Sequence, residues 1–206
     1  MTKFLPLIFI PYFALKRRMR ILTSALITIA LIAIATQFVF DWRYSSTLVQ
    51  LRAGGMITSE LDQSLAGMIR RLGGSEMVAR IAIVIALALL SWLFFRARNC
   101  SSIEELEWST LIVAMVLLPP HNEQYYFVLL LFPYLALAAR ELRRSAKWWL
   151  GVSFVLTGTL IPLSIVSRLT GTNVFSAYLA LGIPFVGAAI LAALCVSGMS
   201  YAVLRE

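Results

Sequence analysis

Long apolar stretches, set apart by short charged clusters, constrain the fold of this chain more than any other feature. Residues 21–40 contain no charged side chain, and comparable stretches cover residues 78–95, 149–166 and 174–203. A helix needs about 20 mostly apolar residues to cross the hydrocarbon core of a bilayer. In lipid, only an α-helix or a closed β-barrel provides hydrogen-bond partners for every backbone N–H and C=O group. The sequence has no alternating pattern typical of a β-barrel. These stretches therefore predict membrane-spanning helices.

Composition supports the same class. The 206 residues are 60% hydrophobic and only 14% charged, with a mean hydropathy of +0.85, which is too apolar for a soluble domain. The net charge of +8 comes from cations beside the apolar stretches, a distribution that the positive-inside rule explains without a nucleic-acid partner. Cys100 and Cys195 share no CxxC spacing and no histidine pattern, so neither a zinc site nor a disulfide framework is indicated and we expect two free thiols. The sequence contains no P-loop, GxGxxG or HExxH motif, and we expect no metal site and no cofactor.

We therefore expect an all-α fold, a multispanning transmembrane helical bundle with about six to seven spans, broken helices included. Residues 1–206 would form a single membrane domain. Residues 4–15, followed by the basic cluster of residues 16–20, are interpreted as the exit half of a span. Pro162 and Pro184 are expected to interrupt the last two spans, whose small residues suit close helix packing.

A polar turn divides the apolar run of residues 111–139. Pro119 and Pro120 cannot continue a helix, so the helix that reaches them has to end there. Six hydrogen-bonding side chains follow, in residues 121–126. The simplest interpretation is a solvated turn. The arms on either side are short for a bilayer, however, which favours a motif that lines a cavity inside the membrane.

Residues 41–77 form the longest segment between spans. Ser59 with Asp62 has the spacing of a capping box, and the glycine pair 73–74 is a typical helix stop. Between them, apolar and polar residues fall on opposite faces, which predicts an amphipathic helix near residues 59–72 at the membrane surface. The expected apolar face is Leu61, Leu65, Met68, Ile69 and Leu72, and the expected polar face is Glu60, Gln63, Ser64, Gly67 and Arg71.

The cationic clusters set the expected orientation. The strongest clusters lie at residues 16–20, 96–98 and 140–147, and placing all of them in the cytoplasm agrees with the alternation of the spans. The segment of residues 41–77 and the turn at His121 then face the same, extracytoplasmic side. We therefore expect the two polar segments to face each other.

Four residues on that side carry candidate chemistry. His121, the only histidine, could transfer a proton or contact a phosphate, although a lone histidine is more often a satisfied polar residue. Glu123 could act as a general base or accept a hydrogen bond from a hydroxylated ligand. Arg70 and Arg71 could bind a phosphate through paired hydrogen bonds, or could instead interact with the helix C-terminus and lipid headgroups.

Three stretches together resemble glycosyltransferase family 87, the polyprenyl-phosphate-mannose-dependent mannosyltransferases of the multispanning GT-C superfamily. They are the proline-bearing segment of residues 6–18 with its basic end, the segment DQSLAGMIRRL at residues 62–72, and the hairpin of residues 120–133. Their order and spacing both fit the family. Asp62 stands where the family often has Asn, and Tyr125 stands where it often has His.

The resemblance implies transfer of a hexose, mannose, from a polyprenyl-phosphate donor to a glycolipid or glycan acceptor outside the cytoplasm, with inversion at the sugar carbon. It also implies a bacterial plasma-membrane, multi-pass protein. The implied substrate-binding residues are His121, Glu123, Tyr125, Gln63, Ser64, Arg70 and Arg71.

The resemblance is to the C-terminal portion of that family. The family's catalytic aspartate lies in an earlier extracytoplasmic loop that has no counterpart here, so the catalytic residue is unknown. The chain alone is therefore expected to be inactive, with an N-terminal half as a missing partner.

Other classes of membrane protein remain compatible with the sequence. The chain could be a non-catalytic protein that binds a lipid phosphate, or a small transporter with a broken helix at its site. A transporter of that kind predicts an internal repeat, and the hairpin of residues 120–133 has no counterpart elsewhere. A purely structural subunit is a third interpretation.

Overall fold

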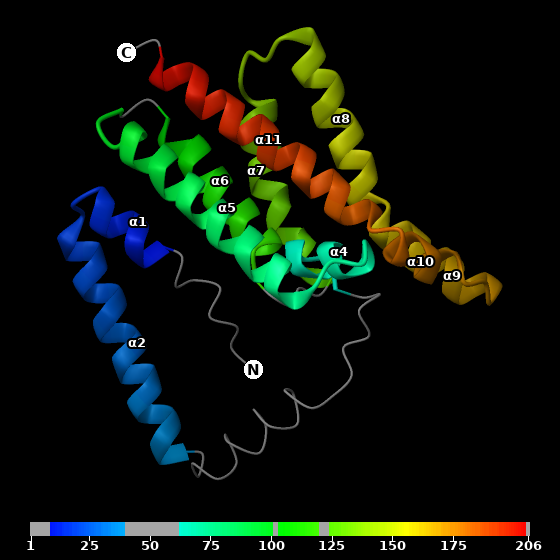
Figure 1. The fold of residues 1–206 in the computed structure, drawn as a ribbon, viewed down its shortest axis with the longest axis horizontal. Helices are drawn as coiled ribbons and strands as arrows, with labels where there is room; N and C mark the ends of the chain where they lie inside the picture. The colour runs from blue at the N-terminus through cyan, green and yellow to red at the C-terminus, as the bar shows by residue number, and fades with distance from the viewer. Residues whose placement is uncertain (1–8, 40–61, 101–102, 120–123, 205–206) are drawn as a thin grey trace. The chain divides into compact units, whose positions relative to one another are not determined.

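The computed structural model describes residues 9–39, 62–100, 103–119 and 124–204. These residues form helices and connecting turns, and no strand occurs among them (Figure 1). The contacts divide the chain into two compact units, Met1–Thr58 and Ser59–Glu206. The expected all-α membrane bundle is confirmed. Three helical segments are long and apolar enough to cross a bilayer, namely Glu76–Ala97, Arg144–Thr170 and Ile183–Val203.

The first unit contains two helices, α1 (Phe9–Leu15) and α2 (Met19–Val39), joined at the basic cluster. Arg17 adopts a left-handed backbone with φ of 53°, and the Arg18 N–H donates to the carbonyl of Phe13. This geometry ends α1 at the cluster. α2 begins two residues before the predicted span of residues 21–40 and ends one residue before its end.

The second unit begins with the short helix α4 (Leu65–Arg71) and the long helix α5 (Glu76–Ala97). Gly73 has φ of 83°, which glycine adopts without strain, and the Gly74 N–H donates to the carbonyl of Ile69. The helix stop predicted at residues 73–74 is therefore confirmed.

The predicted break at the two prolines is also present. α6 (Glu104–Leu117) ends two residues before Pro119, and the chain resumes as the 3-10 helix η2 (Gln124–Leu130), which leads into α7 (Leu131–Ala138). Pro133, near the start of α7, lacks the backbone donor that α geometry would use there. With 14 residues, α6 is about 21 Å long and shorter than a bilayer core, so the arm before the turn is short as predicted.

Four further helices complete the unit, α8 (Arg144–Gly158), α9 (Leu160–Thr170), α10 (Val174–Ala180) and α11 (Ile183–Val203). α8 and α9 are separated at Thr159, three residues before the predicted interruption at Pro162. The last predicted span, residues 174–203, is two helices. The break falls at Gly182, which has φ of 67°, while Pro184 lies in the first turn of α11, where proline is tolerated. Pro184 therefore starts a helix and does not interrupt one.

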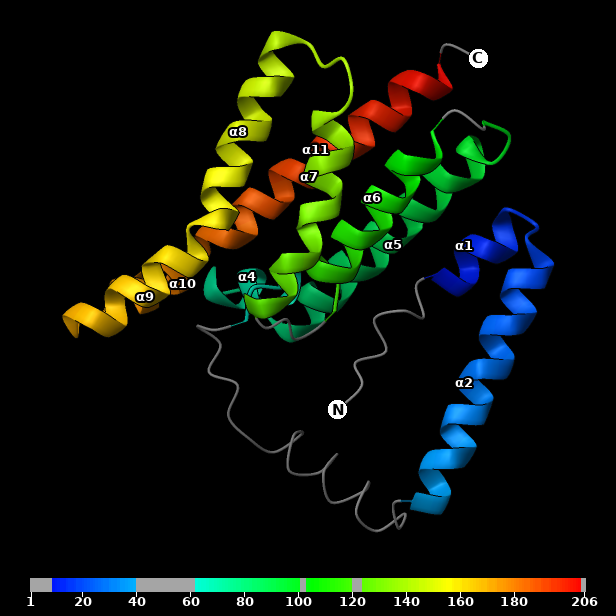
Figure 2. The same cartoon turned by 180° about the vertical axis from the view of Figure 1, so that it is seen from behind.

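α11 is the centre of the second unit and packs against both α6 and α8, as the two opposite views show (Figures 1 and 2). One of its faces is fully buried by Ala188, Leu191, Cys195 and Met199. Gly187 permits a close approach to α8, because a Cβ there would lie 2.7 Å from Thr157 Cγ2. The close packing expected from the small residues is thus present at this contact.

A buried hydroxyl cluster joins α7, α8 and α11. The Tyr134 hydroxyl lies 2.6 Å from Ser153 Oγ and 2.9 Å from Thr157 Oγ1, and Ser153 Oγ donates to the Gly187 carbonyl at 2.6 Å. An unpaired hydroxyl inside an apolar bundle costs free energy, so this network specifies how the three helices meet.

The second unit has two chemically different ends. α4 lies at one end, beside the start of α5 (Figure 2). At the other end, Arg140 Nη2 lies 3.6 Å from Glu105 Oε2, and Arg143 Cζ lies 5.7 Å from the centre of the Tyr201 ring. These contacts join the start of α6, the end of α7, the start of α8 and the end of α11. The side of the membrane that each end faces stays a prediction.

Candidate functional site

A run of buried polar side chains leads into α4. Asp62, Gln63 and Ser64 have exposed fractions of 1%, 0% and 0%. Ser64 is the N-cap of α4, because its hydroxyl accepts the Gly67 N–H at 3.0 Å, and its own N–H donates to Asp62 Oδ1 at 3.0 Å. A Cβ at Gly67 would lie 2.3 Å from the Asp62 carbonyl oxygen. The start of the helix therefore requires glycine at this position.

The carbonyl oxygen of Leu179 connects α4 to the end of α10. Gln63 Nε2 donates to this oxygen at 2.9 Å, and Arg71 Nη1 donates to it at 2.6 Å. The other terminal nitrogen of Arg71, Nη2, donates to the backbone carbonyl of Asp62 at 2.9 Å. One guanidinium thus joins two backbone segments, which its planar set of donors allows.

The surroundings of Arg71 indicate a positioning role. Burial lowers the pKa of the Arg71 guanidinium, and the negative charge of Asp62 offsets part of this effect. Arginine nevertheless keeps its proton in proteins. Because both terminal nitrogens are bonded to carbonyl oxygens, Arg71 fixes α4 in place.

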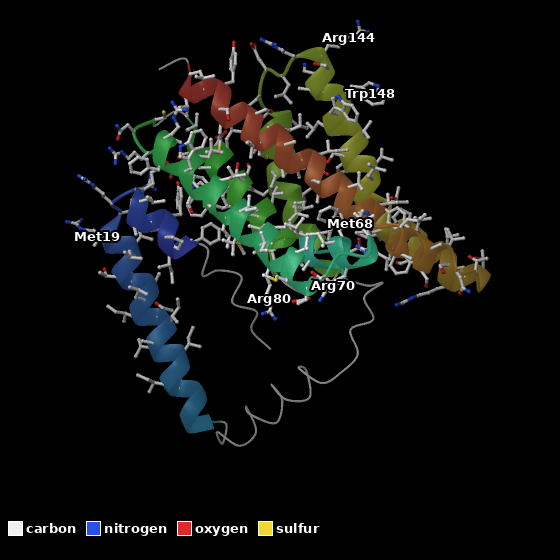
Figure 3. All side chains as sticks on the ribbon, in the orientation of Figure 1. Met19, Met68, Arg70, Arg80, Arg144 and Trp148 are labelled. Carbon is white, nitrogen blue, oxygen red and sulfur yellow. The ribbon has the colours of Figure 1, made fainter. Side chains whose placement is uncertain are left out.

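Arg70 connects the buried part of the site to its exposed edge. Arg70 Nη2 lies 2.6 Å from Asp62 Oδ2, and Nη1 lies 3.3 Å from Glu76 Oε2. The side chains of Asp62, Arg70 and Glu76 are 1%, 27% and 50% exposed, so water screens the second ion pair far more than the first. Arg80 reaches the other oxygen of Glu76 at 3.5 Å, and Figure 3 shows Arg70 and Arg80 at this edge.

The turn between α10 and α11 is shaped to receive α4. Gly182 has φ of 67°, and a Cβ there would lie 2.9 Å from Met68 Sδ and 3.4 Å from Arg71 Nη2. A side chain at this position would strain the backbone and press on α4. The break that separates α10 from α11 therefore also makes room for the site.

This arrangement can bind an anion at its exposed edge. An incoming phosphate would compete with half-exposed Glu76 for Arg70 Nη1, while buried Asp62 keeps Nη2 oriented. Arg80 beside Glu76 adds positive charge there. Six residues make up what we call the α4 cluster, and they are Asp62, Gln63, Ser64, Arg70, Arg71 and Glu76.

Four predicted site residues meet in this cluster, namely Gln63, Ser64, Arg70 and Arg71. The predicted capping box of Ser59 with Asp62 is wrong, because Ser64 is the N-cap of α4 and Asp62 precedes the helix. Ser59 lies outside the described residues. Of the predicted polar face, Gln63, Ser64 and Gly67 are buried and Arg71 is partly buried, whereas Leu72 of the predicted apolar face is 75% exposed. Gln63 and Arg71 both donate to the Leu179 carbonyl. Glu60 and Leu61 lie outside the described residues. The location of α4 at the membrane surface stays a prediction.

The remaining predicted site residues belong to the proline-bounded turn. His121 and Glu123 lie outside the described residues, and Tyr125 is described only as backbone in η2. The predicted meeting of this turn with α4 therefore stays a prediction. Among the residues that the structure does describe, no group of three or more His, Cys, Asp or Glu side chains could hold a metal ion.

Sequence reasoning missed four parts of the site, namely the carboxylates of Asp62 and Glu76, the Leu179 carbonyl and Gly182. A backbone acceptor has no side-chain signature, so nothing in the sequence marks Leu179. The glycine two residues before Pro184 was the one sign in the sequence that a helix would be interrupted here.

Comparison with known families places a match on the part of the chain that contains α4. The model of glycosyltransferase family 87 matches residues 1–120, more than half of the chain. The matched part includes residues 6–18 and 62–72, and the hairpin of residues 120–133 begins at its last residue. No curated protein and no solved structure matches the chain.

Proposed function

The chain belongs to glycosyltransferase family 87, and from this premise we propose that it takes part in transferring mannose from a polyprenyl-phosphate donor to a glycolipid or glycan acceptor. Family membership makes the protein a membrane glycosyltransferase. The identity of the donor, the class of acceptor and the extracytoplasmic side of the reaction are the content of our proposal. A bacterial plasma-membrane, multi-pass protein would have the lipid-linked donor, and a glycolipid acceptor, in its own bilayer.

The observation that carries the proposal is the position of Arg70 between a buried and a half-exposed carboxylate. Asp62, 2.6 Å away and 1% exposed, fixes one side of the guanidinium. Glu76, 3.3 Å away and 50% exposed, is the group that a donor phosphate would replace. A guanidinium oriented before the ligand arrives binds a phosphate without first losing its own freedom.

The proposed reaction makes use of this cation. The acceptor hydroxyl oxygen attacks the anomeric carbon, a base takes the hydroxyl proton, and the bond from that carbon to the phosphate oxygen breaks. The electron pair leaves with the phosphate, whose charge changes from about −1 in the diester toward about −2 in the monoester. An arginine on that phosphate therefore binds the transition state more strongly than the ground state.

The other predicted residues have supporting roles in this proposal. Arg71, Gln63 and Ser64 position α4, and His121 and Tyr125 contact the donor from the proline-bounded turn. Glu123 accepts a hydrogen bond from the sugar. We assign the base to an aspartate outside this chain, so the chain would be inactive without the polypeptide that carries it.

The test is a transfer assay in proteoliposomes with radiolabelled polyprenyl-phosphate mannose and a lipid-extract acceptor. One sample contains the full chain alone, and a second contains it joined to the product of the upstream reading frame. We expect labelled product only in the second sample. Donor binding without turnover in both samples would favour the non-catalytic lipid-phosphate-binding protein, and neither binding nor turnover would overturn the proposal.

Single substitutions test the site within the active sample. Arg70→Gln is expected to lower turnover by about 100-fold, the usual effect of removing one preorganised donor from a developing anion. His121→Ala is expected to lower it as well. Arg168→Gln, an exposed arginine near the end of α9, is the control and should leave turnover unchanged. Unchanged turnover in both Arg70→Gln and His121→Ala would remove these residues from the donor site.

A further inference from the structure

The start of α8 carries an exposed surface that is both basic and aromatic. We call it the α8 basic patch, and it consists of Arg143, Arg144, Lys147, Trp148 and Trp149. Trp148 and Trp149 are 66% and 49% exposed, and their rings meet edge to face at 5.6 Å. Figure 3 shows Arg144 and Trp148 projecting from the first turns of α8.

The charge of this surface is only partly balanced within the protein. Residues 139–149 contain four cations and one carboxylate, which gives 4 − 1 = +3. Arg140 is paired with Glu105 at 3.6 Å, and Arg143 lies over the ring of Tyr201. Across the described part of the chain, neither Arg144 nor Lys147 forms an ion pair. Two exposed cations are therefore available to a ligand from outside the chain.

The direction of α8 increases the positive potential at these cations. Its first turn contains no acidic residue, and no side chain caps it. Cations near a helix N-terminus oppose the helix dipole and are usually avoided there. The first turn of α8 itself supplies no anion that would offset this cost, so an external anion would bind favourably there.

The position of the patch identifies the layer that it meets. α8 and α9 form a candidate span that begins at Arg144. The α8 surface beyond the patch stays apolar and exposed, as Phe154 and Val155 are 51% and 60% exposed. Tryptophans at the end of such a span lie at headgroup depth, and lysine or arginine there lies beside lipid phosphates.

From these observations we infer that the α8 basic patch binds the headgroup of an anionic phospholipid from the surrounding bilayer. Arg144 and Lys147 contact the lipid phosphate, and Trp148 and Trp149 pack against its glycerol and upper acyl region. This inference does not depend on the proposed function, because the patch and the α4 cluster lie at opposite ends of the second unit (Figure 3).

Lipid binding to the full chain can be measured by native mass spectrometry of the detergent-purified protein titrated with phosphatidylglycerol or phosphatidylcholine. We expect tighter binding of phosphatidylglycerol. The double variant Arg144→Gln with Lys147→Gln should weaken that binding by about 10-fold or more, since each cation near a headgroup contributes a several-fold effect. Arg168→Gln is the matched control, an exposed arginine at the far end of the same span, and should retain wild-type affinity.

Each outcome of this experiment decides the inference. Equal affinity for the two lipids, or equal losses in the double variant and in Arg168→Gln, would overturn it. Displacement of the lipid by soluble glycerol phosphate at equal concentration would show a free-phosphate site and overturn it too. A thermal unfolding profile of the double variant that matches the wild type would exclude misfolding as the cause of weaker binding.

Discussion

The α4 cluster and the α8 basic patch are both rich in arginine, and they satisfy their charges in opposite ways. Arg70 and Arg71 donate to the buried carboxylate of Asp62 and to backbone carbonyls. Arg144 and Lys147 are exposed at the start of a candidate span. The first region therefore contributes to the stability of the fold, whereas the second depends on what surrounds the protein.

This difference has an energetic basis. Removing one member of a buried ion pair leaves the other charge uncompensated, which costs several kcal/mol, whereas exposed charges contribute roughly 0 to 1 kcal/mol. Substitutions in the two regions should therefore separate into those that alter the unfolding free energy and those that alter only ligand binding. Four changes test this separation, from the largest expected effect to the smallest.

Asp62→Ala should have the largest effect. It leaves Arg70 without its buried partner and the Ser64 N–H without its acceptor, so we expect a loss of about 3 kcal/mol in unfolding free energy. Denaturant titration in detergent micelles measures it. Glu76→Gln is the control, because this half-exposed partner of Arg70 should cost less than about 1 kcal/mol. Equal losses would show that burial of Asp62 does not matter.

Gly182→Ala should follow, with a loss of about 2 kcal/mol. The left-handed backbone disfavours a Cβ, and the added carbon would also press on Met68 Sδ at 2.9 Å. Gly73→Ala is a matched control, since Gly73 has a similar φ but nothing within 4 Å of the added carbon. The difference between the two thermal unfolding shifts measures the contact with α4, and equal shifts would argue against that contact.

Arg71→Lys should cost about 1 to 2 kcal/mol, because one ammonium cannot reproduce the paired donation to Leu179 and Asp62. A double-mutant cycle with Gln63→Leu provides the check. The two side chains share one acceptor, so their effects should not be additive. Additive effects would mean that the Leu179 carbonyl does not couple them.

Arg144→Gln should have the smallest effect on the fold, within about 0.5 kcal/mol of the wild type, because the side chain is exposed and outside the ion pairs of the described residues. Chemical unfolding in zwitterionic detergent, where no anionic lipid is present, measures it. A loss comparable to that of Asp62→Ala would place Arg144 among the residues that stabilise the fold and would remove the contrast between the two regions.

Hydropathy and backbone-breaking residues were sufficient to predict much of the fold. The uncharged stretch at residues 21–40 became α2, and the stretch at residues 78–95 lies inside α5. Pro119 and the glycine pair 73–74 ended their helices as predicted. These signals act locally, through desolvation or a forbidden backbone angle, so they survive in any tertiary context.

The candidate site was harder to predict from the sequence than the fold, because its key contacts are long-range. Gln63, Ser64, Arg70 and Arg71 could be named in advance, but the acceptor that binds Gln63 is a backbone carbonyl 116 residues away. That carbonyl becomes available because the helix is interrupted at Gly182, whereas the sequence pattern predicted the interruption at Pro184. Local patterns do not encode which distant backbone group a buried amide will meet.

The bond between Arg71 and Leu179 also bears on how the protein is made. The two residues are 108 positions apart, so at typical synthesis rates Leu179 is added about 5 to 20 s after Arg71. Throughout that interval α4 lacks its acceptor. The donors that end up buried in α4 must meanwhile be hydrated or shielded by the insertion machinery. The site is therefore completed late in biogenesis, when α10 arrives.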